Sequence, residues 1–153
     1  MTMPVHERRV YLDTSVISAL FDERNTERQR MTEDFWKNLE HQAVFISTLV
    51  KDEIEAAPQP LRTRLTKKVK GFQVLNVSTE ATELAEQYIE QGVFSDRYFS
   101  DALHVGVAVF HRVEYLVSWN FTHLVKVRTR QTVNLVNALR GYPGIEIIAP
   151  PEF

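Results

Sequence analysis

Apolar segments of strand length alternate with helical patterns along the chain, and this alternation is the feature that most constrains its fold. Three segments, residues 10–12, 43–46 and 115–117, are apolar throughout and become polar where they end. Such segments are typical of buried parallel strands. Two further strand-like segments cover residues 72–77 and 145–148, and helical patterns cover residues 14–21, 27–39, 49–57, 61–70, 79–91, 100–111 and 129–139. The sequence therefore predicts an α/β fold, a three-layer α/β/α sandwich with a mainly parallel sheet of four to five strands.

The length and composition restrict the class of protein. The 153 residues suffice for one domain, predicted over residues 9–153 after a short N-terminal tail of residues 1–8. The absence of cysteine excludes disulfides, thiolate metal sites and a cysteine nucleophile. No apolar run is long enough to span a membrane or resembles a secretory leader, so we expect a cytoplasmic protein without a membrane partner. The net charge of −2 gives no global attraction to nucleic acid, so a polyanionic partner requires local basic patches or metal ions.

Asp13 is the first candidate functional residue, because it directly follows the first predicted strand. In open α/β sheets, ligands bind outside the carboxyl ends of the strands. The alternative is structural, since aspartate is a preferred helix N-cap and a helical pattern follows. The hydroxyls of Thr14 and Ser15, beside Asp13, are predicted to contact substrate.

Glu53 is the second candidate, because it falls on the apolar face of the predicted helix 49–57. Asp52 and Glu55 point away from that face and are expected to be solvated. A carboxylate on the buried side of a helix is costly unless it is paired or bound to a metal. The alternative for Glu53 is therefore a buried salt bridge to an arginine.

Asp101 is the third candidate, in the first turn of a helix that Ser100 is expected to cap. The positive end of the helix dipole stabilises an anion there, which is also its structural explanation. His104 shares a helix face with Asp101 and can orient it by a hydrogen bond or contact substrate. After the strand 115–118, Asn120 can accept a hydrogen bond or hold a water, and His123 can donate to a phosphate, although both can simply form the turn.

Three carboxylates without cysteine or paired histidine ligands make a hard oxygen site, which suits Mg²⁺ or Mn²⁺ rather than zinc. Such ions bind substrate phosphates, so the predicted reaction is hydrolysis of a phosphodiester by a metal-activated water. Basic residues near such a site are candidate phosphate contacts that position a strand without reading its sequence. Lys67 and Lys68 are predicted to bind substrate, within a basic set made of Arg62, Arg64, Lys67, Lys68, Lys70, Lys126, Arg128 and Arg130.

Three motifs carry a resemblance to a known family. They are Leu12-Asp13-Thr14-Ser15-Val16-Ile17, Ile46-Ser47-Thr48 leading to Glu53-Ile54, and Asp101-Ala102-Leu103-His104-Val105. In this order and spacing the chain, from Val10 to Ile148, resembles a PIN domain, and more narrowly the VapC-type toxins of bacterial toxin–antitoxin pairs. The resemblance implies a divalent-metal-dependent endoribonuclease, usually a homodimer, that acts on RNA and is neutralised by a small cognate antitoxin.

Carried over to this chain, the resemblance makes Asp13, Glu53 and Asp101 the metal-binding acids. It adds Asn120 to the catalytic set, at a position after the fourth strand where the family often has a fourth acid. This departure bears on a second metal site and on the level of activity.

Three other classes of protein are alternatives to this interpretation of the motifs. A phosphoaspartyl phosphatase requires a second acid two residues after the first, where this chain has Ser15. A receiver domain requires an aspartate after its third strand, where the chain offers only Asn76. The remaining alternative is a catalytically weak or inactive PIN-like domain that binds nucleic acid or protein, with its acids acting as structural caps.

Overall fold

The computed structural model describes residues 6–153 and is built around one five-stranded sheet. Its strands are β1 (Arg9–Leu12), β2 (Ala43–Ser47), β3 (Gln73–Leu75), β4 (Tyr115–Val117) and β5 (Glu146–Ile148). Their order in the sheet is β3-β2-β1-β4-β5, and every neighbouring pair is parallel. The predicted parallel sheet is therefore confirmed, with five strands.

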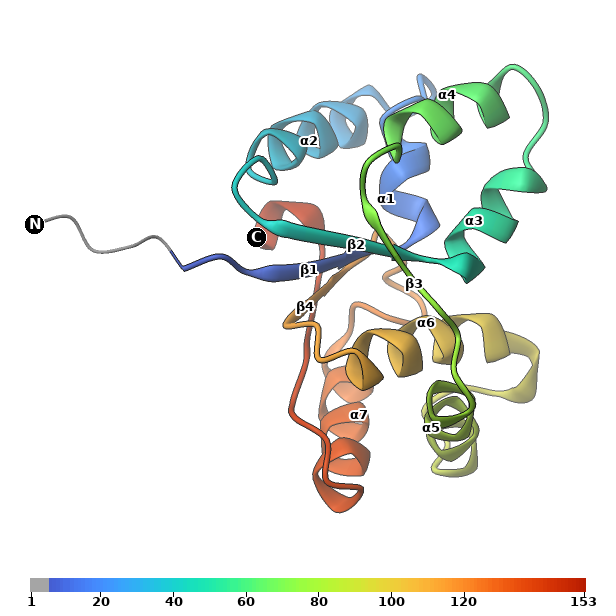
Figure 1. Cartoon of the computed structure of the whole chain (residues 1–153), viewed down its shortest axis with the longest axis vertical. Coiled ribbons are helices and arrows are strands. Elements are labelled where there is room, and N and C mark those ends of the chain that lie inside the picture. The colour runs from blue at the N-terminus through green and yellow to red at the C-terminus, as the bar shows by residue number, and fades with distance from the viewer. Residues whose placement is uncertain (1–5) are drawn as a thin grey trace, which may run out of the picture.

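Helices cover both faces of the sheet, as the sequence predicts. They are α1 (Thr14–Ala19), α2 (Thr26–Lys37), α3 (Thr48–Glu55), α4 (Leu61–Lys68), α5 (Thr79–Glu90), α6 (Phe99–Phe110) and α7 (Val127–Leu139), with short 3₁₀ turns η1 (Asp96–Tyr98) and η2 (Pro150–Glu152). Figure 1 shows α1 to α4 on one side of the sheet and α5 to α7 on the other. No helix within residues 6–153 is long and apolar enough to cross a membrane. Residues 1–5 of the predicted N-terminal tail lie outside the described residues.

The strand order places a switch point between β1 and β4. From β1 the chain builds outward through β2 and β3, then returns to the other side of β1 to add β4 and β5. At such a point the connections leave in opposite directions, and a crevice opens at the carboxyl ends of the two central strands. Asp13 follows β1 and Ser118 follows β4. These two residues therefore lie at the crevice where this topology predicts a ligand site.

Serine residues that follow strands begin two of the helices. Ser47 and Ser78 are the N-caps of α3 and α5, each accepting a hydrogen bond from a backbone N–H three residues later. The prediction that Ser100 caps a helix is wrong. The turn η1 leads directly into α6, which begins at Phe99 with Tyr98 at its N-cap position, so Ser100 lies within the first helical turn.

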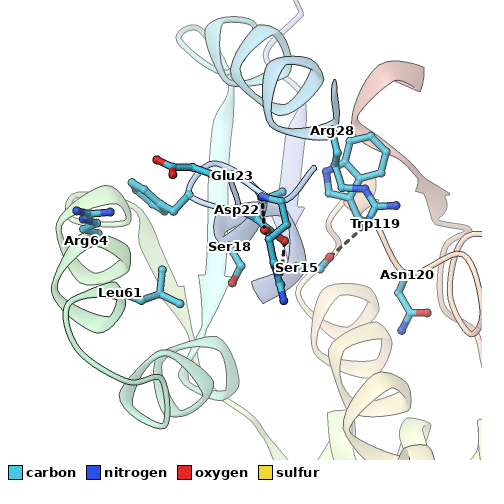
Figure 2. A pocket seen from close by; sticks show the side chains of 12 residues that line it. Ser15, Ser18, Asp22, Glu23, Arg28, Leu61, Arg64, Trp119 and Asn120 are labelled. Atoms are coloured by element: carbon cyan, nitrogen blue, oxygen red, sulfur yellow. Dashed lines mark hydrogen bonds and ion pairs between the residues drawn. The ribbon is translucent and has the colours of Figure 1, made fainter. Parts of the chain in front are cut away.

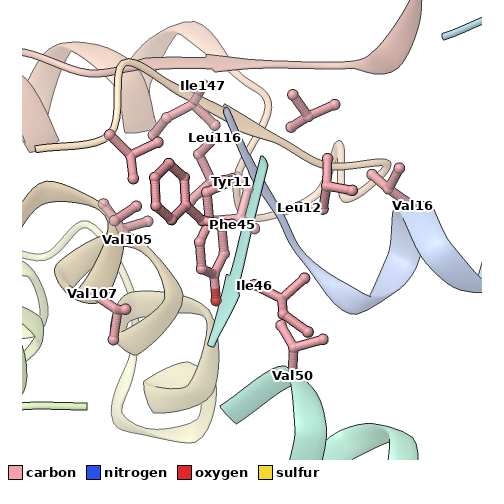
Figure 3. Close-up of a cluster of buried hydrophobic side chains, with 14 of the residues drawn as sticks. Tyr11, Leu12, Val16, Phe45, Ile46, Val50, Val105, Val107, Leu116 and Ile147 are labelled. Carbon is pink, nitrogen blue, oxygen red and sulfur yellow. The ribbon is translucent and has the colours of Figure 1, made fainter. Parts of the chain in front are cut away.

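The core contains residues from both faces of the sheet, including the fully buried Tyr11, Leu12, Ile46 and Leu116 (Figure 3). Among these four, Tyr11 carries a polar group, and its hydroxyl reaches the carboxyl edge of the sheet, where it contacts Ser47. The core is thus connected to that edge by a hydrogen-bonding group.

Candidate active site

Asp13 joins β1 to α1 at the switch point. Its Oδ1 accepts hydrogen bonds from Val16 N (3.4 Å) and Ser15 Oγ (2.5 Å), which makes Asp13 the N-cap of α1. Ser118 Oγ, from the end of β4, donates to the other oxygen, Oδ2 (2.5 Å). The side chain is buried, with 5% of the residue exposed. Asp13 is therefore both the N-cap of α1 and a buried acid at the carboxyl edge of the sheet.

The charge of Asp13 lies in an unfavourable environment. Burial raises the pKa of its carboxyl above the ordinary value, although His104 and hydrogen bonds from Ser118, Ser15 and Val16 act in the opposite direction. Within residues 6–153, no lysine or arginine forms a salt bridge with it. A buried carboxylate without a basic partner is a candidate ligand for a cation.

Glu53 extends from α3, and its partner is a histidine. His104 Nε2, from α6, lies 2.6 Å from Glu53 Oε1, and the ring's Nδ1 lies 2.6 Å from the Tyr11 hydroxyl. The alternative of a salt bridge to arginine is therefore wrong. Glu53 is partly buried, whereas Asp52 and Glu55 are exposed, as the helical pattern predicts.

Asp101 lies in the first turn of α6 and is partly buried. Burial, and in smaller part the charge of Glu53, raise the pKa of its carboxyl, whereas His123 and a hydrogen bond from Asn120 act to lower it. Asn120 Oδ1 accepts from the backbone N–H of His123 (2.9 Å), and the His123 ring stacks on Tyr98 at 3.8 Å between centroids. Asn120 and His123 thus belong to a turn that reaches the side chain of Asp101.

The three acids face one region of the sheet edge without forming a finished metal site. The charges of Asp13 and Glu53 both contribute to raising the pKa of the Tyr11 phenol, after burial as the main cause. Within residues 6–153, however, no three Asp, Glu, His or Cys side chains are grouped closely enough to hold one ion. Thr14 Oγ1 is buried and has no hydrogen-bond partner among the described residues. The donor types suit a hard cation.

A cavity of about 860 Å³ opens beside Ser15 and Asn120. It is lined by Ser15, Ser18, Ala19, Phe21, Asp22, Glu23, Arg24, Arg28, Leu61, Arg64, Trp119 and Asn120. In Figure 2, Arg64 of α4 and Arg28 of α2 lie on opposite sides of this cavity. The Arg28 guanidinium lies 4.9 Å from the centroid of the Trp119 ring. The carboxyl edge of the sheet therefore adjoins a groove with basic side chains on its walls.

A family model for the PIN domain matches residues 10–120. The chain belongs to the PIN-domain family. The match begins in β1 and ends at Asn120, so it includes both sides of the switch point. A search of curated protein sequences found no match.

Solved structures share this PIN-domain fold at low sequence identity. VapC20 from Mycobacterium tuberculosis, a toxin that cleaves the sarcin–ricin loop, is 15% identical with a TM-score of 0.60, over 74% of this chain and 92% of that chain. FitAcB from Neisseria gonorrhoeae is 13% identical with a TM-score of 0.60, over 94% and 99%. VapBC2 from Rickettsia felis, bound to a DNA fragment from its promoter, is 15% identical with a TM-score of 0.56, over 92% and 97%. These likenesses establish the fold.

The PIN domain places the predicted substrate-binding residues in different environments. Ser15 lines the groove, and His123 lies close enough to Asp101 to affect its pKa. His104 is only 3% exposed, and both ring nitrogens contact protein groups. Its predicted contact with substrate is therefore not supported, and its hydrogen bond goes to Glu53 rather than to Asp101.

The basic helix α4 contributes to the groove through a residue other than the predicted lysines. Arg64 is among the lining residues of the groove, whereas Lys67 and Lys68 are not. The Lys68 ammonium lies 5.2 Å from the centroid of the Trp36 ring. The sequence identified the basic helix, but only the packing of α4 shows which of its charges adjoin the site.

Three contributors to the site were missed from the sequence. Ser118 holds Asp13, Tyr11 holds His104, and Arg28 lines the groove. The polar end of the fourth strand was a usable signal for Ser118. A tyrosine inside an apolar strand carries no comparable signal, because only the tertiary structure shows what its hydroxyl contacts.

Proposed function

We propose that this PIN domain is a divalent-metal-dependent endoribonuclease, the toxin of a type II toxin–antitoxin pair. The observation that carries the proposal is the burial of two carboxyls, Asp13 at the switch point and, in part, Asp101 in the first turn of α6. Neither forms a salt bridge with a lysine or arginine within residues 6–153. Burying two acids without a lysine or arginine partner costs stability, and a bound cation offsets that cost.

Asp13, Glu53 and Asp101 would hold Mg²⁺ or Mn²⁺, since hard cations prefer carboxylate oxygens. The ion supplies an activated water and neutralises charge on the phosphate that is attacked. Ser15 and Ser118 fix the Asp13 carboxylate by a hydrogen bond to each oxygen. Oδ1 also accepts from Val16 N, whereas Oδ2 accepts only from Ser118 among the described residues and keeps a further lone pair for a cation.

Asn120 takes part as a neutral group. Its Oδ1 accepts from His123 N, which leaves the amide N–H₂ to donate to Asp101. A donor at this place holds the Asp101 carboxylate without adding a fourth negative charge. Asn120 therefore acts as a positioning residue in the proposed site.

Arg64 and Arg28 are the proposed phosphate contacts, because they line the groove that adjoins Ser15 and Asn120. An overall charge of −2 gives RNA no general attraction, so binding depends on such local cations. The proposed partners are a small antitoxin and a second copy of this chain, in the cytoplasm. The antitoxin partner is supported by the shared fold with a structure described as a toxin–antitoxin complex and with one described as a member of a family of toxin–antitoxin systems.

The test measures Mn²⁺ binding by titration calorimetry and cleavage of single-stranded RNA in Mg²⁺ or Mn²⁺. Asp13→Asn and Asp101→Asn are expected to lose both, and Glu53→Gln to weaken both. Glu55→Gln is the matched control, because Glu55 is an exposed acid on the same helix. Attack by water leaves a free phosphate end rather than a 2′,3′-cyclic phosphate.

Two results would contradict the proposal. Wild-type protein that binds no Mn²⁺ would favour the inactive binding module instead. Binding and cleavage that persist in both aspartate variants would show that other residues carry the activity.

A further inference from the structure

Four side chains from four elements form a continuous hydrogen-bonded chain beneath the site. Ser47 Oγ lies 2.8 Å from the Tyr11 hydroxyl, which lies 2.6 Å from Nδ1 of His104, whose Nε2 lies 2.6 Å from Glu53 Oε1. The first three residues are buried, with Tyr11 fully inaccessible and His104 3% exposed. Only the last member, Glu53, reaches solvent, with 36% of its side chain exposed. We call these four residues the Ser47–Glu53 chain.

With Glu53 ionised and the His104 ring neutral, the hydrogen-bonding capacities of the groups fix the direction of this chain. An ionised Glu53 can only accept, so His104 Nε2 carries a hydrogen and donates. In the neutral ring Nδ1 then accepts, and the Tyr11 hydroxyl donates to it. Tyr11 in turn accepts from Ser47, whose oxygen accepts from the backbone N–H of Val50 (3.3 Å). This is the arrangement in which every hydroxyl of the chain both donates and accepts.

The environment of Tyr11 keeps its hydroxyl able to donate. Tyr11 is fully inaccessible to solvent, so its hydroxyl finds its acceptor within the protein, at Nδ1 of His104. A buried donor of this kind is costly without its acceptor, so Nδ1 of His104 is held in position by the core.

We propose that His104, supported by Tyr11, is a positioning residue that fixes Glu53 for cation binding. The inference rests on the proposed function of the site. A glutamate on a helix has several accessible rotamers, and repulsion from Asp101 disfavours those that bring the two carboxylates together. The bond to Oε1 anchors the side chain and leaves its second oxygen for the cation. Groups that orient metal ligands in this way change metal affinity by about 10- to 100-fold when they are mutated.

The experiment compares Mn²⁺ affinity among variants that differ in what replaces the imidazole. His104→Leu removes both hydrogen bonds and is expected to weaken Mn²⁺ binding by about tenfold or more. His104→Gln carries an acceptor and a donor on one amide group, and is expected to recover most of that loss. At saturating Mn²⁺, RNA cleavage by His104→Leu should return towards the wild-type rate, because the residue acts on the ligand and not on the reacting atoms.

A pair of tyrosine variants separates positioning from stability. Tyr11→Phe and Tyr88→Phe each remove a buried hydroxyl that bonds a side chain; Tyr88 donates to Asn137, on α7, and is not part of the Ser47–Glu53 chain. Both should lower the midpoint of thermal unfolding. Only Tyr11→Phe should also weaken Mn²⁺ binding. This pair decides the question even if His104→Leu does not fold.

The outcomes distinguish failure of the inference from failure of the proposed function. If wild-type protein binds no Mn²⁺, the proposed function fails and the inference fails with it. If Asp13→Asn abolishes binding while His104→Leu and Tyr11→Phe bind as tightly as wild type, only the positioning role is overturned. Equal affinity of Tyr11→Phe and Tyr88→Phe, both weaker than wild type, would also overturn it, since the effect would then be one of general stability.

Discussion

Replacing Asp13 by asparagine or by alanine should have opposite effects on the stability of the metal-free protein. Asparagine keeps the shape: its Oδ1 can accept from Ser15 and Val16, and its amide N–H₂ can donate to the Ser118 hydroxyl. It also removes a buried negative charge. Alanine removes the charge too, but it deletes the N-cap of α1 and leaves the two serines without their shared acceptor.

The difference between the two variants can be estimated from these contacts. Loss of an N-cap side chain costs about 0.5–2 kcal/mol. The serine hydroxyls lie 3.4 Å apart and can partly replace the carboxylate for each other, so roughly one further hydrogen bond is lost, at about 1 kcal/mol. We therefore expect Asp13→Ala to unfold about 1–3 kcal/mol more easily than Asp13→Asn. For a domain of this size, 2 kcal/mol corresponds to a difference of about 4–8 °C in the unfolding midpoint.

The raised pKa of Asp13 also determines how the stability of the wild-type protein changes with pH. Because the pKa of Asp13 is raised in the folded state, the folded protein binds more protons than the unfolded chain between the two pKa values. The contribution of Asp13 to the free energy of unfolding therefore falls as pH rises from the unfolded to the folded pKa, and then stays constant. Asp13→Asn lacks this fall, so its advantage over wild type should grow through that interval and be fully present at neutral pH.

Urea denaturation of wild type and both variants, in a chelator and at a series of pH values, measures these differences. Equal stability of Asp13→Asn and Asp13→Ala would show that the cap and the serine contacts contribute nothing. An Asp13→Asn variant less stable than wild type at neutral pH would show that the carboxylate is stabilising as a charge, which would refute the reasoning.

Two further predictions concern helix packing and the groove. Gly106→Ala places a Cβ 2.4 Å from the backbone oxygen of Ala81, which cannot rotate away, so α5 and α6 must separate. We expect this substitution to lower the free energy of unfolding by about 1–3 kcal/mol. Gly144→Ala is the control and should be nearly neutral, because its Cβ meets Asn134 Oδ1 only at 3.4 Å. Stability of Gly106→Ala equal to wild type in urea would show that the helices are not locked together. Arg64→Ala should lower the slope of log affinity for single-stranded RNA against log salt by about 0.7, as for one lost phosphate contact, with a smaller effect from Lys67→Ala. The reverse ranking would assign the contact to the outer face of α4.

The fold could be predicted because its signal is local and repeated. A parallel strand that is buried on both faces must be apolar, so β1 and β2 were evident in the sequence. Asp13 was recognised as a possible cap because it follows β1 where a helical pattern begins. The predicted start of α6 is wrong because the 3₁₀ turn η1 runs directly into the helix, which begins without a side-chain cap hydrogen bond. A helix that begins in this way has no capping residue for the sequence to reveal.

A site residue could be predicted only where its environment follows from the sequence pattern of its own helix or strand. Glu53 on an apolar helix face was a reliable anomaly, but the identity of its partner was not available, since His104 lies 51 residues away on another helix. Arginine was the reasonable alternative on general grounds, because buried charges are paired. The orientation of α4 was likewise a tertiary property, so its charges could be recognised without being assigned to the groove.

Asp13 and Asn120 show why a structural role and a functional role should not be weighed as exclusive alternatives. Each follows a central strand, and each uses one oxygen to close the turn that comes next: Asp13 accepts from Val16 N, and Asn120 from the N–H of His123. The local bond fixes the side chain with its second polar atom directed away from the turn, towards Ser118 in one case and Asp101 in the other. An aspartate at position 120 would keep the turn but lose the donor to Asp101, and its charge would raise the pKa of that carboxyl further. The amide is therefore compatible with a site in which Asp101 remains ionised, and it argues for a role as donor rather than as a fourth cation ligand.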